Sequence, residues 1–202
     1  MASTPEVAFA GGKTSTAEAS RVEDQARRGF LPGVNFVLRI LLLATSVSAL
    51  VVLVTSKQTA TVPVLVQPQF PIFVTTTAKF NHSPAFTYLL VALAVACLYS
   101  IITVMASASF MSKSAASSRA LFQLMVFDLF MLAIMASATG ASASIAYVGL
   151  KGNSHVMWNK VCNVFDKFCR HVGSSTLLAL VASVILLFLV VLSSSTIYRR
   201  SY

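Results

Sequence analysis

The stretch VNFVLRILLLATSVSALVVLV, residues 34–54, is long and apolar enough to cross a bilayer, yet it contains Arg39. A second stretch, ALFQLMVFDLFMLAIMASATGASASIA at residues 120–146, has the same character and contains Asp128. A charge at the centre of a membrane helix costs about 2.5–3.5 kcal/mol on insertion scales. We therefore expect the fold to hide both charges from lipid, most simply by pairing them with each other.

The composition of the chain is that of a membrane protein. Of its 202 residues, 56% are hydrophobic and 10% are charged, whereas soluble domains carry about 25% charged residues. The net charge of +9 would suit a nucleic-acid partner, but the basic residues are scattered between apolar blocks and form no stripe. They are typical of membrane-flanking positions, which prefer Lys and Arg, so no nucleic-acid partner is expected.

Four apolar segments have the length of a membrane helix, which is about 20 residues. They are residues 34–54, 85–107, 120–146 and 172–192. This pattern predicts an all-α membrane protein, a four-helix transmembrane bundle built from residues 30–196. Residues 1–29 are polar with mixed charges and are expected to form a disordered cytosolic tail, with Pro32 and Gly33 breaking the chain before the first span. Residues 197–202 would form a second, short cytosolic tail.

The segment between the first two spans, residues 55–84, has strand-like composition. The runs VPVLVQ (62–67) and PIFVTTT (71–77) are rich in β-branched and aromatic residues. They favour a short β-hairpin in this loop, which we expect to be extracellular. Asn81 begins a sequence with the form of a glycosylation site, but Pro84 follows directly, so use of Asn81 is left open.

Small side chains recur at helical spacing in two of the spans. They are Ala92, Ala96 and Ser100 in the second span and Ala136, Gly140 and Ser144 in the third. Such strips let helix backbones approach closely, so both are predicted to be helix-packing faces. The third span is also longer than the hydrocarbon requires, at roughly 40 Å, and should tilt or protrude on the outer side.

The loop before the fourth span contains Cys162 and Cys169. An even number of spans puts both termini on one side, and a small excess of Lys and Arg there favours cytosolic termini. A disulfide persists only outside the cytosol, so a Cys162–Cys169 disulfide, worth about 2 kcal/mol, would agree with this orientation. Two free thiols are one alternative. A metal site that adds His155 and His171 is another, although the spacing fits no familiar zinc pattern.

The two intramembrane charges leave more than one function open. A proton relay or ion pathway would use Arg39 and Asp128 to line a polar path, but transporters usually show broken helices or repeats. Alternatively, Arg39 could extend to the interface and Asp128 could be protonated. Beyond the N-terminal tail the only acids are Asp128 and Asp166, and we find no nucleophile–base–acid set. We therefore expect neither enzymatic activity nor a cofactor.

Taken together, these residues resemble the plant CASP-like (Casparian strip membrane domain protein-like) family, which is related to the four-span MARVEL proteins. The resemblance is carried by Arg39, Asp128, the run AKFNHSPAFTYLLVALAVACLYS (78–100) and VCNVFDKFC (161–169). It covers nearly the whole chain beyond the N-terminal tail and is strongest to the first subgroup.

The resemblance implies a plasma-membrane scaffold that forms oligomers with itself and with related members. It also implies that the scaffold organises membrane domains and recruits secreted cell-wall enzymes, and that Arg39 and Asp128 are its functional residues. The founding members carry an acidic, aromatic-rich signature in the first outer loop, whereas residues 66–80 here contain no acid. A broader CASP-like scaffold is therefore expected rather than a role in the Casparian strip itself. A pore or transporter and a MARVEL-type trafficking adaptor are the alternatives.

Overall fold

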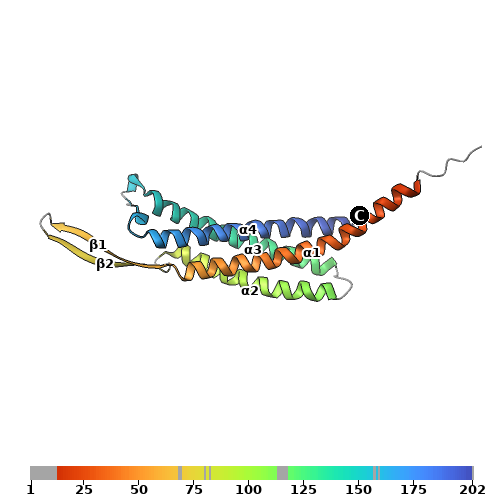
Figure 1. The fold of residues 1–202 in the computed structure, drawn as a ribbon, viewed down its shortest axis with the longest axis horizontal. Coiled ribbons are helices and arrows are strands. Elements are labelled where there is room, and N and C mark those ends of the chain that lie inside the picture. Colours follow the sequence, from red (N-terminus) through yellow and green to blue (C-terminus); the bar gives the residue numbers. More distant parts are fainter. Residues whose placement is uncertain are drawn as a thin grey trace, which may run out of the picture.

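A computed structural model has four long helices side by side and a two-stranded sheet at one end (Figure 1). It describes residues 13–67, 70–79, 81, 83–112, 118–156, 158 and 160–201. The helices are α1 (Lys13–Val54), α2 (Pro84–Ser112), α3 (Ser118–Lys151) and α4 (Asp166–Ser201). Each contains a segment long and apolar enough to cross a membrane. The predicted fold class, an all-α bundle of four membrane helices, is therefore confirmed.

All four helices continue beyond the predicted spans, and α1 does so most. It begins at Lys13, so the prediction of a disordered tail is wrong for residues 13–29; residues 1–12 lie outside the described part of the chain. Residues 13–29 are rich in Ala, Glu and Arg, which favour helix. Pro32 and Gly33 lie inside α1 rather than in a break before it. A proline inside a helix lacks its own N–H donor and its ring crowds the carbonyl of the preceding turn, yet the turns on either side of Pro32 continue the helix. At the other end of the chain α4 runs on to Ser201, so most of the predicted C-terminal tail is helical as well.

The helices follow one another around the bundle in chain order. Extensive contacts join α1 to α2, α3 to α4 and α4 to α1, whereas a smaller contact joins α2 to α3. The diagonal pairs, α1 with α3 and α2 with α4, make little backbone contact. The start of α1 and the end of α4 lie at the same end of the bundle, opposite to the sheet (Figure 1). Any link across a diagonal must therefore be made by long side chains.

The interior of the bundle is apolar and draws on all four helices. Its completely buried large side chains include Leu42, Leu53, Leu89, Leu93, Met135, Leu186 and Leu189. The outward faces carry exposed Val, Leu, Ile and Phe side chains, which suit contact with lipid. Because the inward and outward faces of the helices are both apolar, the few polar side chains indicate which face of a helix points into the bundle.

A two-stranded antiparallel sheet connects α1 to α2, in the segment where the sequence favours a hairpin. Its strands are β1 (Lys57–Gln67) and β2 (Phe70–Lys79), with an irregularity of register between Leu65 and Gln67. The two-stranded sheet projects away from the bundle (Figure 1). Its base is tied to α4, because the side-chain oxygen of Gln58 accepts a hydrogen bond from the backbone N–H of Phe168 at 2.8 Å. Asn81 follows β2 and is exposed, and its glycosylation stays a prediction.

The connection from α3 to α4 is a short, cross-linked loop. Gly152 ends α3 with a positive φ of 71° and donates its N–H to the Val148 carbonyl at 2.8 Å, a common way for a helix to stop. Two single turns follow, η2 (Ser154–Val156) and η3 (Val161–Asn163). A disulfide between Cys162 and Cys169 then joins η3 to the first turn of α4. This is the predicted disulfide, so the free-thiol alternative does not hold.

The metal-site alternative gains no support from the described residues. His155 and His171 are exposed, and His171 contacts the carbonyl oxygen of Lys167 through Nδ1 at 2.7 Å. Within the described ranges, no three His, Cys, Asp or Glu side chains gather as metal ligands would. Both loop sulfurs are bonded to each other, which removes the thiolates that zinc would need.

Candidate functional site

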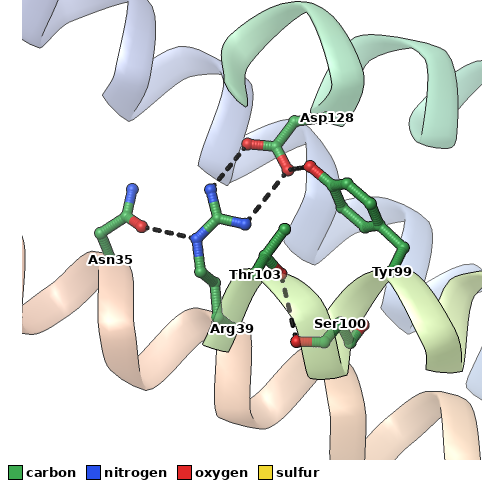
Figure 2. Close-up of polar contacts among 6 residues, drawn as sticks. All are labelled: Asn35, Arg39, Tyr99, Ser100, Thr103 and Asp128. Atoms are coloured by element: carbon green, nitrogen blue, oxygen red, sulfur yellow. Dashed lines mark hydrogen bonds and ion pairs between the residues drawn. The ribbon is translucent and has the colours of Figure 1, made fainter. Parts of the chain in front are cut away.

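Arg39 of α1 and Asp128 of α3 lie in direct contact inside the bundle (Figure 2). Nη2 of Arg39 is 3.0 Å from Oδ2 of Asp128, and Nη1 is 3.4 Å from Oδ1. The exposed fractions of the two residues are 1% and 0%. The contact is two-pronged, the geometry in which a guanidinium matches a carboxylate best. It links α1 and α3, which are diagonal in the bundle and make little other contact.

Two further side chains complete a network around the pair (Figure 2). Tyr99 of α2 donates its hydroxyl hydrogen to Oδ1 of Asp128. Asn35, one helical turn before Arg39, accepts a hydrogen bond from Nε at 2.9 Å. The network therefore connects three of the four helices. The sequence predictions named neither residue.

Different signals would have been needed to find these two residues. Asn35 precedes Arg39 by four positions, and side chains at that spacing are neighbours on a helix, so local spacing was enough. Tyr99 lies on another helix, and its contact with Asp128 depends on how α2 is rotated and how deeply it sits. That information is not contained in any local pattern of the sequence.

The hydrogen bonds around Asp128 suit an ionised carboxylate. Its oxygens accept from Nη1 and Nη2 of Arg39 and from the hydroxyl of Tyr99. All three partners donate to it, and an ionised carboxylate offers acceptors and no donor. The arrangement is therefore that of a buried, hydrogen-bonded charge pair.

Buried hydroxyl groups near the network are bonded within their own helices. The hydroxyl of Ser46 donates to the Leu42 carbonyl at 2.7 Å, Ser100 donates to the Ala96 carbonyl at 2.7 Å, and Thr103 donates to the Ser100 carbonyl at 3.1 Å. The last of these bonds is drawn in Figure 2. Because each hydroxyl hydrogen is already used, these three groups do not extend the charge pair into a polar path.

The two small-residue strips lie in different surroundings. Ala92, Ala96 and Ser100 on α2 are buried, with exposed fractions of 1%, 1% and 0%. By contrast, Ala136, Gly140 and Ser144 on α3 are exposed. The α2 strip therefore packs inside the bundle, whereas the α3 strip lies on its outer surface, and its role as a helix-packing face stays a prediction. The buried side of α3 contains Met131, Met135, Ala138 and Ser142, and α4 is the helix that α3 contacts most.

Comparison with known proteins agrees with the resemblance seen in the sequence. The family model of the Casparian strip membrane protein domain matches residues 29–185. The chain belongs to the CASP-like family. CASP-like protein 1D1 from Musa acuminata is 62% identical over 168 residues, which cover 83% of this chain and 88% of that protein. No solved structure shows a significant match.

Two further CASP-like relatives support the assignment to the first subgroup. CASP-like protein 1D1 from Populus trichocarpa is 55% identical, over 86% of this chain and 87% of its own. CASP-like protein 1D1 from Oryza sativa subsp. japonica is 54% identical, over 84% of this chain and 82% of its own. Both Arg39 and Asp128 fall inside the region that the family model matches. This CASP-like chain is thus a plant-type, multi-pass membrane protein with a buried charge pair between α1 and α3.

Proposed function

We propose that this protein is a non-enzymatic scaffold that self-associates in the plasma membrane. The observation that carries the proposal is the exposed small-residue face of α3, formed by Ala136, Gly140 and Ser144. A Cβ atom added at Gly140 would meet no atom within 4 Å. Among the four candidate spans, that of α3 has the smallest buried share. Nothing described in the chain covers this face.

The α3 face differs from lipid-facing surface elsewhere in the protein. On α2, for example, Leu98, Ile102 and Met105 expose 64%, 65% and 67% of their surface. On α3, every exposed side chain between residues 136 and 144 is Ala, Ser or Gly. In hydrocarbon, small residues favour helix association because they let two backbones approach closely. The natural occupant of this face is a helix of a second copy or of a related family member.

The orientation belongs to the same proposal. The start of α1 and the end of α4 lie at one end of the bundle (Figure 1), and the Cys162–Cys169 disulfide lies in the connection at the opposite end. Disulfides are maintained outside the cytosol, which supports cytosolic termini. The two-stranded sheet and the α3–α4 connection would then face the cell exterior, where secreted cell-wall enzymes could be recruited.

A pore that uses Arg39 and Asp128 has less support. Both residues are shut off from the surface, and their hydrogen bonds connect them to each other and to Tyr99 and Asn35. A conducting path needs polar groups along its length that bind and release an ion in turn.

A MARVEL-type trafficking adaptor would share this bundle but would reside in vesicles, so imaging of a tagged full-length chain separates it from a plasma-membrane scaffold.

The test of self-association is the substitution Gly140→Leu. Because a Cβ at this position meets no atom of the same chain, the single chain should fold normally while the bulky side chain keeps a second copy away. We expect particles in lipid nanodiscs, or counted by single-molecule photobleaching, to shift to monomers. Ala94→Leu, at an exposed position of α2, is the matched control and should leave the particle size unchanged. An unchanged size for Gly140→Leu would contradict the proposal.

A further inference from the structure

The end of the bundle that carries the disulfide is strongly cationic. Its exposed cations are Lys57, Lys151, Lys160, Lys167 and Arg170. The acidic residue in the same region is Asp166, which lies in the first turn of α4, where a carboxylate complements the helix dipole. None of the five cations forms an ion pair with a carboxylate in the part of the chain that the structure describes. We call this surface, formed by residues 57–58, 147–156, 158 and 160–171, the outer cap.

Short contacts hold the α3 side of the outer cap together. Cγ of Lys160 lies 3.3 Å from the position that a Cβ on Gly152 would occupy. The stem of this lysine therefore rests against the residue that follows Lys151. The backbones of Asn153 and Trp158 exchange two hydrogen bonds, of 3.0 and 2.9 Å. The loop is thus closed on itself, and its cations stay close to the end of α3.

The α4 side is fixed by two further links. The disulfide joins Cys162 to Cys169, which precedes Arg170. The hydrogen bond from Phe168 to Gln58 has Lys57 next to one partner and Lys167 next to the other. Lys57 at the start of β1 is therefore held close to the charges of the α3–α4 connection and of the first turns of α4, although it is about 100 residues away in the sequence.

Two aromatic side chains lie exposed in the same region. Trp158 exposes 60% of its surface and Tyr147 exposes 64%. Trp158 follows the end of α3 by seven residues, so it lies in the connection rather than in the span. Its backbone is occupied by the pairing with Asn153, while its ring is available. A large ring with an apolar face and a polar N–H suits ligands that are part apolar and part polar.

Membrane insertion does not account for these cations. The positive-inside rule places Lys and Arg on the cytosolic side, and the anionic lipids that attract them are concentrated in the cytosolic leaflet. Under the proposed orientation the outer cap faces the opposite side. Its positive charge is therefore better matched to an anionic partner outside the cell than to lipid.

We propose that the outer cap binds an acidic polysaccharide, a polymer of uronate sugars. Its carboxylates would pair with the cap cations while the ring of Trp158 lies against a sugar face. Four of the five cations are lysines, whose ammonium groups are point charges on flexible stems, as suits a polymer with repeated charges better than one fixed anion. Exposed charge pairs are screened by salt. The inference rests on the proposed function, which puts this end of the bundle outside the cell.

The experiment uses the full chain in nanodiscs of neutral lipid, where both ends are accessible whatever the orientation in cells. Polygalacturonate is the probe. Trp158 is the single tryptophan of the chain, so in nanodiscs with a tryptophan-free belt protein its fluorescence reports on the outer cap directly. We expect a saturable change in this fluorescence that weakens as salt rises. Fully methyl-esterified polygalacturonate, which has the same sugar chain without the charge, should produce no such change.

Substitutions then locate the binding surface. The quadruple variant Lys151→Ser, Lys160→Ser, Lys167→Ser, Arg170→Ser should bind polygalacturonate about tenfold more weakly or worse, because four exposed charge pairs are lost together. Arg119→Ser removes an exposed cation at the opposite end of α3 and should bind like the parent chain. An intact Cys162–Cys169 disulfide, checked by mass under non-reducing conditions, shows that each variant has kept the cap.

Four outcomes would overturn the inference. These are an absence of binding, equal binding to the methyl-esterified polymer, an unchanged affinity in the quadruple variant, and equal affinity for poly-glutamate. The last would assign the cap to an acidic protein instead. Failure of the proposed function is seen separately, because an outer cap found in the cytosol of intact cells refutes the orientation whatever polygalacturonate does in nanodiscs.

Discussion

Arg39 meets Asp128 in an interior that water does not reach, and this decides what each charge contributes. Removing two charges from water is expensive, and their attraction offsets much but not all of that cost. The pair is therefore not a large source of net stability. Its importance lies in the consequence of losing one member, because the other charge would remain buried without a partner.

We predict that Asp128→Asn destabilises the bundle by about 3–5 kcal/mol, the usual penalty for breaking a buried ion pair from one side. The amide can still accept a hydrogen bond, but it cannot neutralise the guanidinium of Arg39. The measurement is unfolding of purified protein by SDS titration in mixed micelles. The double variant Arg39→Met, Asp128→Leu removes both charges and should recover much of the loss. If the single and double variants all unfolded like the parent chain, the pair would have no structural role.

Tyr99 offers a milder test of the same network. Tyr99→Phe keeps the ring and removes the hydroxyl that donates to Asp128. Hydrogen bonds to charged groups contribute about 1.5–3 kcal/mol, so we expect a loss of stability in this range in the same titration. Tyr88→Phe is the matched control, since the Tyr88 hydroxyl bonds to Ser137 at an exposed site, at 2.8 Å. An equal, small effect of both substitutions would show that Tyr99 only packs.

Among the elements, the end of α3 depends most on one residue. Gly152 adopts a φ of 71°, and a Cβ there would lie 2.8 Å from the Trp158 carbonyl oxygen. Left-handed backbone costs other residues about 1–2 kcal/mol, and the close contact adds to it. Gly152→Ala should therefore lower the unfolding midpoint and slow formation of the Cys162–Cys169 disulfide during refolding. Gly173→Ala, where a Cβ meets no atom within 4 Å, should do neither.

The same helix shows what the sequence could and could not predict. Residues 120–146 predict a long apolar helix with Asp128 on its inner side, because lipid excludes a charge. The strip of Ala136, Gly140 and Ser144 predicts close packing but does not say whether the neighbour belongs to the same chain. Only the rotation of α3 in the bundle decides this, and that rotation is set by contacts with α4 that are distant in the sequence. Tyr99 was missed for the same reason.

For the whole molecule, the charge network restricts how the helices can be arranged. Contacts around the ring follow chain order, whereas α1 and α3 face each other across a diagonal. A bundle of similar apolar helices could be arranged in several orders with comparable burial. Only orders that bring Arg39 within reach of Asp128, with Tyr99 alongside, leave no buried charge unpaired. Across the other diagonal, the rings of Phe86 and Phe168 meet edge to face at 6.3 Å.

The orientation of the whole molecule can be tested with engineered thiols. Two of the three cysteines form the disulfide and Cys97 is buried, so the parent chain should react little with a membrane-impermeant maleimide. Arg119→Cys places an exposed thiol in the first turn of α3, and Ser154→Cys places one just beyond its other end. On intact protoplasts we expect labelling of Ser154→Cys alone, and labelling of Arg119→Cys only after permeabilisation. Each variant serves as the other's control for expression. The reverse labelling pattern would place the disulfide in the reducing cytosol and would refute cytosolic termini.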